Sequence, residues 1–264
     1  ALVRLIPSFA RLSAYFSTAL YNLNSVQFIE HDLKKKSSKN INKVNKKNSI
    51  KTMEITGVRL DYINKDNSKL SEKFNSLNIN LKKGNIYGVY GESGSGKSSL
   101  LNLLSGFIKP NKGKIFINNK NYSFYDLTKK FKIGYAPQIA TILDENIIIN
   151  STLKFSNTNK KIEELKKYLQ IFNLKKFVNK KYFDNKGISS IKNMSGGEKQ
   201  RIGFLRAIIN EPNLILLDEP TSSLDKKNEK AIFDYLISIK KDKIIVVTSH
   251  KEDQKKYFDE IINL

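Results

Sequence analysis

The sequence contains no cysteine and only two histidines among its 264 residues. Without cysteine, neither a disulfide framework nor a cysteine-ligated metal site is available. The two histidines, His31 and His250, are far apart in the sequence, and nothing resembles the ligand spacing of a zinc site. These absences exclude disulfide-rich and zinc-centred classes, and they leave a chain long enough for one large domain or two small ones.

Arginine is also scarce, although the chain is strongly basic. Of the 47 basic residues, 42 are lysine and 5 are arginine, and the net charge is +22. Such a charge invites a nucleic-acid interpretation, but specific phosphate and base recognition favours the planar arginine fork. The lysines are spread along the chain, with one dense run from Lys34 to Lys51. We therefore expect solvated lysine faces, attraction to an anionic membrane surface as a second effect, and no specific nucleic-acid partner.

Residues 91 to 98 read G-E-S-G-S-G-K-S and match the phosphate-binding loop pattern G-x-x-x-x-G-K-[ST] without a mismatch. The context also fits, because N-I-Y-G-V-Y before the loop is typical of a buried strand and S-S-L-L-N-L-L after it is typical of a helix. An ordinary glycine- and serine-rich turn is the alternative, but it does not explain why strand, loop, lysine and serine occur in register. The pattern therefore predicts a nucleoside triphosphate site.

The residue types in this loop suit its chemistry. Gly91, Gly94 and Gly96 are expected to adopt positive φ, so that backbone N–H groups approach the phosphates closely. The helix that starts near Lys97 adds its positive dipole end. Lys97 reaches the β- and γ-phosphates, and the Ser98 hydroxyl ligates Mg²⁺. The predicted nucleotide contacts of this segment are Gly91, Glu92, Ser93, Gly94, Ser95, Gly96, Lys97, Ser98 and Ser99.

A second motif, N-L-I-L-L-D-E-P, occupies residues 213 to 220. Its apolar run suits a strand buried on both faces of a parallel sheet, and ligands bind at the carboxyl edge of such sheets. Asp218 is placed there to hold Mg²⁺, directly or through water, and Glu219 to polarise an attacking water. A strand that merely ends in an acidic turn is the alternative, which the phosphate loop upstream disfavours.

The third motif is M-S-G-G-E-K-Q-R, from Met194 to Arg201. It predicts a helix capped by Ser195 that runs through about Ile209, with N–H groups near Gly196 and Gly197 open to an anion; a plain helix start is the alternative. With the other two motifs, in this order, it resembles the signature sequence of the ATP-binding cassette (ABC) ATPases, L-S-G-G-Q. The departures at 194 and 198 are mild.

The resemblance covers about residues 53–264 and implies further site residues. Tyr62 lies where the family has an aromatic that stacks on adenine; a tyrosine packed within a β-layer is the alternative. Gln138, in Y-A-P-Q, matches a glutamine that contacts Mg²⁺ and water in the loop that senses the membrane domain. Residues 222–225, S-S-L-D, match a loop that crosses to the partner subunit. His250 matches the switch histidine that contacts the γ-phosphate.

The two ends of the sequence suggest that the resembling region is one part of a longer protein. Residues 1–31 carry apolar side chains at helical spacing, but Arg4 and Arg11 interrupt them before the roughly 20 apolar residues that span a bilayer. They resemble the cytoplasmic end of the last membrane helix of ABC exporters, and R-L-I-P-S-F is similar to lipid-linked oligosaccharide flippases. Residues 32–52, rich in Lys, Asn and Ser, are typical of a flexible linker. The early end at Leu264 and the missing initial Met suggest a fragment of a half-transporter.

We therefore expect an α/β fold with a RecA-like parallel sheet, an antiparallel β-layer at about residues 53–90 and an inserted helical subdomain at about 138–208. The resemblance implies that the chain pairs head to tail around two ATP, either with a second copy of itself or with a homologous cassette. The phosphate loop of one chain and Ser195, Gly196 and Gly197 of the other would enclose each nucleotide. Hydrolysis would let the pair open and drive the membrane domain.

The predicted function is thus the Mg²⁺-dependent ATPase of an exporter half-transporter at the cytoplasmic face of the cell membrane. One alternative is a soluble ABC ATPase of DNA repair or translation, which usually carries a coiled-coil insertion or two cassettes. Another is an importer subunit made as a separate chain, which usually begins near its first strand. An unrelated phosphate-loop kinase or GTPase is disfavoured by S-G-G-E and T-S-H.

Overall fold

A five-stranded parallel sheet forms the centre of the fold in the computed structural model. The structure describes residues 49–63, 70–155, 158–184 and 188–264, apart from the side chains of 62, 63, 70–73, 125, 189 and 190. All four strand pairs are parallel. In spatial order the strands are β6 (Ile133–Ala136), β7 (Leu214–Asp218), β8 (Ile244–Thr248), β3 (Ile86–Tyr90) and β9 (Glu260–Asn263).

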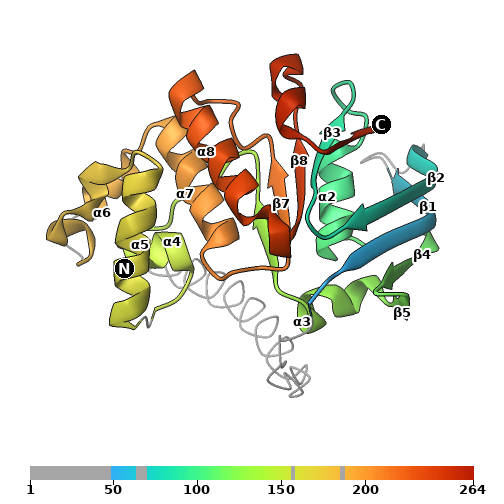
Figure 1. Ribbon diagram of the computed structural model, residues 1–264, viewed down its shortest axis with the longest axis horizontal. Helices are drawn as coiled ribbons and strands as arrows, with labels where there is room; N and C mark the ends of the chain where they lie inside the picture. The colour runs from blue at the N-terminus through green and yellow to red at the C-terminus, as the bar shows by residue number, and fades with distance from the viewer. Residues whose placement is uncertain (1–48, 64–69, 156–157, 185–187) are drawn as a thin grey trace, which may run out of the picture. The chain divides into compact units, whose positions relative to one another are not determined.

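Helices cover both faces of this sheet, which is why its central strands read as unbroken apolar runs. Every residue of β3, β7 and β8 is buried. Leu214 and Leu216 of β7 belong to the same core as helix α2 (Lys97–Ser105). The alternate residues of β7 pack with α7 (Gly196–Ile208) and α8 (Lys226–Ile239) on the other face (Figure 1). The strand predicted at L-I-L-L is confirmed.

A second sheet is antiparallel, with the order β2-β1-β4-β5. Its strands are β1 (Thr52–Ile63), β2 (Leu70–Lys82), β4 (Lys112–Ile117) and β5 (Lys120–Tyr122). The expected extent of this layer, residues 53–90, is wrong at its end. Strand β3 is apolar on both sides and belongs to the parallel sheet, where both sides are covered, whereas residues 112–122 supply the missing antiparallel strands through pairs such as Met53 with Ile117.

Between β6 and β7 the described chain is helical, in the interval where the sequence predicts a helical subdomain. Its α-helices are α4 (Ile147–Thr152), α5 (Asn159–Ile171), α6 (Ile188–Lys192) and α7, with the short 3-10 turns η2 (Lys175–Val178) and η3 (Lys180–Tyr182). Phe172, Phe204 and Tyr235 join α5, α7 and α8 through edge-to-face ring contacts. The remaining short helices are η1 (Phe124–Asp126), α3 (Leu127–Lys130), η5 (Lys240–Asp242) and η6 (Glu252–Tyr257).

The segments predicted at residues 1–31 and in most of 32–52 lie outside the described residues. At the start of the described chain, Ile50 is already buried and Thr52 begins β1. Within the described ranges, every helix is too short or too polar to cross a bilayer.

Candidate nucleotide site

The loop between β3 and α2 has the backbone that the phosphate-binding pattern predicts. Gly94 and Gly96 adopt φ values of 84° and 107°, in the left-handed region that favours glycine. Gly96 is the N-cap of α2, and its carbonyl accepts the first helical bond, from the N–H of Leu100. The first turn of α2 therefore points its N–H groups at the loop, as an anion site requires.

Gly91 also has the predicted positive φ, with a value of 159° that residues with a side chain rarely adopt. Space is a second reason for glycine there, because a Cβ would lie 2.5 Å from Ser95 Oγ and 2.7 Å from the carbonyl oxygen of Leu264. Ser95 Oγ itself is buried and makes no hydrogen bond within the described part of the chain. A buried hydroxyl of this kind fits a loop built around a polar ligand.

Lys97 lies across the mouth of the loop. Its Nζ donates hydrogen bonds to the carbonyl oxygens of Gly91 at 2.8 Å and Glu92 at 2.9 Å. A flexible four-carbon stem lets the ammonium exchange these carbonyls for phosphate oxygens, which bind a cation more strongly. The geometry therefore agrees with a lysine that binds phosphate.

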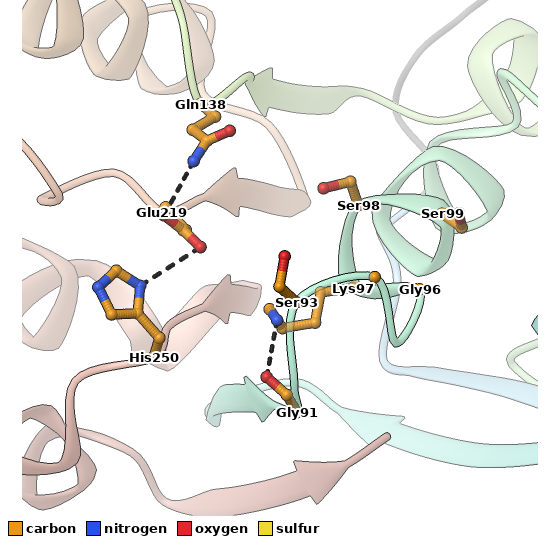
Figure 2. Close-up of a pocket in the computed structure, with 10 residues that line it drawn as sticks. Gly91, Ser93, Gly96, Lys97, Ser98, Ser99, Gln138, Glu219 and His250 are labelled. Carbon is orange, nitrogen blue, oxygen red and sulfur yellow. Dashed lines mark hydrogen bonds and ion pairs between the residues drawn. The ribbon is translucent and has the colours of Figure 1, made fainter.

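A cavity of about 460 Å³ opens over the loop. This size is within the range of ligand sites. Figure 2 shows the loop on one side, with Glu219 flanked by Gln138 and His250 on the other. The cavity is lined by Gly91, Ser93, Gly94, Gly96, Lys97, Ser98, Ser99, Gln138, Glu219 and His250. Of the predicted loop contacts, Glu92 and Ser95 do not line the cavity.

The three predicted catalytic residues meet at the carboxyl edge of the parallel sheet. Gln138 follows β6, Glu219 follows β7, and His250 follows β8, three neighbouring strands. Gln138 Nε2 donates to Glu219 Oε2 at 3.0 Å, and His250 Nδ1 lies 3.4 Å from Glu219 Oε1. The side chain of Glu219 is 17% exposed and that of His250 58%. The carboxylate is thus held in place but still faces the cavity.

Asp218 is more deeply placed than Glu219, with 6% of its surface exposed. Its Oδ1 accepts a hydrogen bond from Thr248 Oγ1 at 2.8 Å, and the same hydroxyl accepts one from the Glu219 N–H at 2.9 Å. Thr248 therefore orders both acidic residues, although the sequence analysis missed it. The available signal was its position directly after the apolar run I-I-V-V and two residues before His250.

The residues present fit Mg²⁺ rather than a metal caged by protein. No cluster of three or more His, Cys, Asp or Glu side chains occurs among the residues described. Mg²⁺ commonly takes one or two carboxylates and completes its shell with water and phosphate oxygens. Asp218, Ser98 and Gln138 carry side-chain oxygens of the kind that this arrangement uses, and their role as Mg²⁺ ligands stays a prediction. Ser98 and Gln138 line the cavity, and Asp218 is not among its lining residues.

Helix α7 begins as the third motif predicts. Ser195 is its N-cap: Ser195 Oγ accepts from the Glu198 N–H at 3.3 Å, and the Ser195 N–H donates to Glu198 Oε2 at 2.9 Å. A Cβ on Gly196 would meet nothing within 4 Å. Ser195, Gly196 and Gly197 do not line the cavity. The structure therefore does not bring this motif to the phosphate loop of its own chain.

Glu198, where the family has glutamine, carries a paired charge. Lys176 Nζ lies 2.5 Å from Glu198 Oε1. Burial raises the pKa of Glu198, but the hydrogen bonds from Lys176 and the Ser195 N–H outweigh it, so that the pKa is below its usual value. The helix start therefore carries a carboxylate whose charge a lysine offsets.

The remaining landmarks are placed only in part. The backbone of Tyr62 pairs with Ser71 at the far end of β1, but its side chain is outside the described part, so adenine stacking stays a prediction. In the segment 222–225, Asp225 is the N-cap of α8, and its Oδ1 accepts from the Asn228 N–H at 2.7 Å.

Comparisons with known proteins show the family of the chain. The family model described as "ABC transporter" matches residues 74–222. A probable ABC transporter ATP-binding/permease protein of Haemophilus influenzae is 34% identical over 71% of this chain, and the match covers 34% of that protein. The lipoprotein-releasing system ATP-binding protein LolD of Rickettsia typhi is 29% identical over 76% of this chain and 90% of its own length. The chain thus spans about a third of the first relative and most of the second.

Among solved structures, the dimeric ATP-binding cassette MJ0796 with bound ADP and phosphate superposes with a TM-score of 0.64. It is 26% identical, and the match covers 80% of this chain and 94% of that one. The expected α/β fold with a RecA-like core is therefore confirmed. With the phosphate loop, the acidic strand and the matching family model together, the chain belongs to the ABC transporter family, as an ATP-binding cassette that hydrolyses ATP.

Proposed function

We propose that this cassette powers an exporter-type ABC transporter by closing and opening as a head-to-tail pair around two Mg-ATP. The observation that carries the proposal is the position of Glu219. Its carboxylate faces the phosphate loop across one cavity and is held by Gln138 and His250. A carboxylate opposite bound phosphates is where a water must be oriented for in-line attack.

Each residue then has a role in the reaction. Lys97 and the loop N–H groups bind the β- and γ-phosphates, and Tyr62 stacks on the adenine. Ser98, Gln138 and Asp218 hold Mg²⁺, which neutralises charge on the transferred phosphoryl group when bound. Glu219 orients and polarises the attacking water, and His250 contacts the γ-phosphate.

The position of α7 supports pairing of two chains. The start of this helix, with its N-cap at Ser195, lies outside the cavity of its own chain, and Ser195 and Gly196 are exposed. In a head-to-tail pair the helix end would reach the partner's γ-phosphate and supply positive potential there. MJ0796 is a cassette that forms a dimer.

A membrane partner is supported by apolar side chains around the loop that carries Gln138. The described residues include four large exposed apolar side chains on this loop or just after α4, which we call the loop patch: Ile139, Leu143, Leu153 and Phe155. Asn150 joins the two parts, because its side chain bonds both backbone groups of Leu143. Large apolar side chains left exposed on two linked segments support a docking surface there, and a membrane domain would place the cassette at the cytoplasmic face of the membrane.

Another assignment has support from a specific observation. The match to LolD covers 90% of that protein, which is named as an ATP-binding protein of a lipoprotein-releasing system. A cassette made as a separate chain is therefore the second candidate. The coding sequence upstream of Ala1 distinguishes the two, since about five or six apolar spans there support the exporter and a start codon next to the cassette supports the separate chain.

The pairing itself is tested by the dependence of ATPase activity on protein concentration. If each site needs two chains, specific activity rises with concentration, because a dimer forms by mass action. The variant Ser195→Arg places a bulky side chain at the helix end that would face the partner, and it should abolish the rise. A specific activity independent of concentration, unchanged in Ser195→Arg, would contradict a shared site.

A further inference from the structure

The side chain of Gln200, in the second turn of α7, joins this helix to the segment that follows β7. It is buried, with 6% of its surface exposed. Its Nε2 donates to the carbonyl oxygen of Glu219 at 3.0 Å and to Ser222 Oγ at 2.6 Å. Its Oε1 accepts from the Ser223 N–H at 3.0 Å. The nitrogen and the oxygen of the amide are therefore both hydrogen-bonded to the short segment 219–223.

The orientation of this amide is fixed by its partners. The Ser223 N–H can only donate and the Glu219 carbonyl can only accept, so exchange of the oxygen and nitrogen of Gln200 would break both contacts. A buried amide with these bonds satisfied is held in one rotamer. Gln200 is thus a rigid link between α7 and the backbone of Glu219.

Glu219 needs such support because its backbone conformation is unfavourable. Its φ is 45°, in the left-handed region that residues with a Cβ seldom adopt. Conformations of this kind persist where surrounding contacts over-determine them. Here the N–H of Glu219 is held by Thr248 Oγ1 and its carbonyl by Gln200 and the Ser222 N–H.

Close packing at the same junction leaves little room for movement. A Cβ on Gly197 would lie 3.0 Å from the carbonyl oxygen of Ser223 and 3.1 Å from Leu224 Cδ2. The first turn of α7 therefore packs directly against the segment that Gln200 binds. A displacement of the helix start would be transmitted to the backbone of Glu219.

We propose that Gln200 is a positioning residue for ATP hydrolysis, which holds the strained backbone of Glu219 so that its carboxylate faces the γ-phosphate. This inference rests on the proposed role of Glu219. In a head-to-tail pair, the start of α7 would meet the ATP bound by the partner, whereas Glu219 would act on the ATP bound by its own chain. Gln200 would therefore join the two sites rigidly. Gln200 does not line the cavity over the phosphate loop, so we expect it to act on turnover and not on binding.

The test is Gln200→Leu in the 264-residue chain, which keeps the side chain's size and removes its hydrogen bonds. Two quantities are measured: kcat for Mg-ATP, and the Kd of a fluorescent ATP analogue. A displaced catalytic group costs on the order of 10- to 100-fold in rate, so kcat should fall by at least about 10-fold while the Kd changes by less than about 3-fold. Equal losses in both quantities, or an unchanged kcat, would overturn the proposal.

A control variant separates positioning from general loosening. Gln254→Leu removes a similarly buried amide, bonded to Thr221, Glu229 and Ser249 but not to Glu219, and should lower Tm without the loss of kcat. If Gln254→Leu loses as much kcat as Gln200→Leu, Gln200 has no special role. If the unsubstituted chain binds and hydrolyses no ATP, the proposed function fails instead.

Discussion

His250 Nδ1 lies 3.4 Å from Glu219 Oε1, although 31 positions separate the two residues in the sequence. They meet because β7 and β8 are parallel neighbours whose carboxyl ends lie at the same edge of the sheet. The pair makes the histidine a candidate for holding both the carboxylate and the γ-phosphate. Carboxylate and phosphate oxygens both accept hydrogen bonds, so a neutral imidazole, with its single N–H, donates to one of them at a time, and only the doubly protonated ring donates to both.

We therefore predict that His250→Ala slows hydrolysis more than it weakens binding. The variant loses a γ-phosphate contact and one of the two groups that hold Glu219, so kcat should fall by about 10-fold or more, as for general acid–base partners. Steady-state kinetics gives kcat, and titration with a fluorescent ATP analogue gives Kd. A Kd that rises as far as kcat falls would assign His250 to binding alone.

Lys97 is the predicted phosphate ligand, and Lys97→Ala should abolish tight binding. Losing hydrogen bonds to a charged group costs about 1.5–3 kcal/mol each, which corresponds to an affinity loss of at least about 10- to 100-fold. Isothermal titration calorimetry with Mg-ATP measures this. Lys120→Ala, a change of the same kind in exposed β5, is the control. Unchanged affinity in Lys97→Ala would remove this loop from the proposed site.

Tyr62 is expected to stack on adenine. Tyr62→Ala should weaken ATP binding by about 1–3 kcal/mol, by analogy with base–aromatic stacking, and Tyr62→Phe should be nearly neutral because the ring remains. The two affinities are compared by calorimetry. Equal losses in the Ala and Phe variants would show that the hydroxyl matters and the ring does not.

The lowered pKa of Glu198 predicts a pH dependence of stability. A carboxyl group whose pKa is lower in the folded state stabilises the fold above its unfolded pKa, and this contribution is lost as the pH falls through the folded value. Glu198→Gln should therefore flatten the fall of Tm on the acid side of about pH 4.5, the region of an ordinary glutamate pKa. Since Lys176 is half exposed, Lys176→Ala should cost less than about 1 kcal/mol at pH 7. Identical Tm curves for the chain and Glu198→Gln would contradict the assigned pKa.

Much of the site could be predicted because its motifs are local. The phosphate loop, the acidic end of β7 and the serine cap of α7 each depend on residues within one turn or strand, so their spacing in the sequence carries the information. Thr248 and Gln200 were missed because their roles arise from contacts between elements distant in the chain. The prediction of the antiparallel layer was wrong for a similar reason. Strand β4 pairs directly with β1, although β3 lies between them in the sequence.

Glu219→Gln is the substitution that separates binding from chemistry. It keeps the size of the side chain and removes its charge, and the single amide oxygen still accepts from one of the two neighbours, Gln138 or His250. A neutral amide cannot take up a proton from the attacking water as a carboxylate does. The rate of hydrolysis should therefore fall by at least about 100-fold, while the affinity for ATP is unchanged. Single-turnover hydrolysis and nucleotide titration measure the two effects, and hydrolysis at the rate of the unsubstituted chain would remove Glu219 from its proposed role.

The same variant should accumulate a closed pair with two ATP between the chains, because the γ-phosphates that join the halves are no longer removed. Size-exclusion chromatography of Glu219→Gln with and without millimolar Mg-ATP shows whether a dimer forms. Ser195→Arg in the same background is the control, since it obstructs the helix end that would meet the partner's phosphate and should return the protein to a monomer. A dimer that persists in the double variant would mean that the chains associate through another surface. A Glu219→Gln protein that stays monomeric while hydrolysis is lost would mean that the isolated cassette cannot close without the membrane domain to hold two copies near each other.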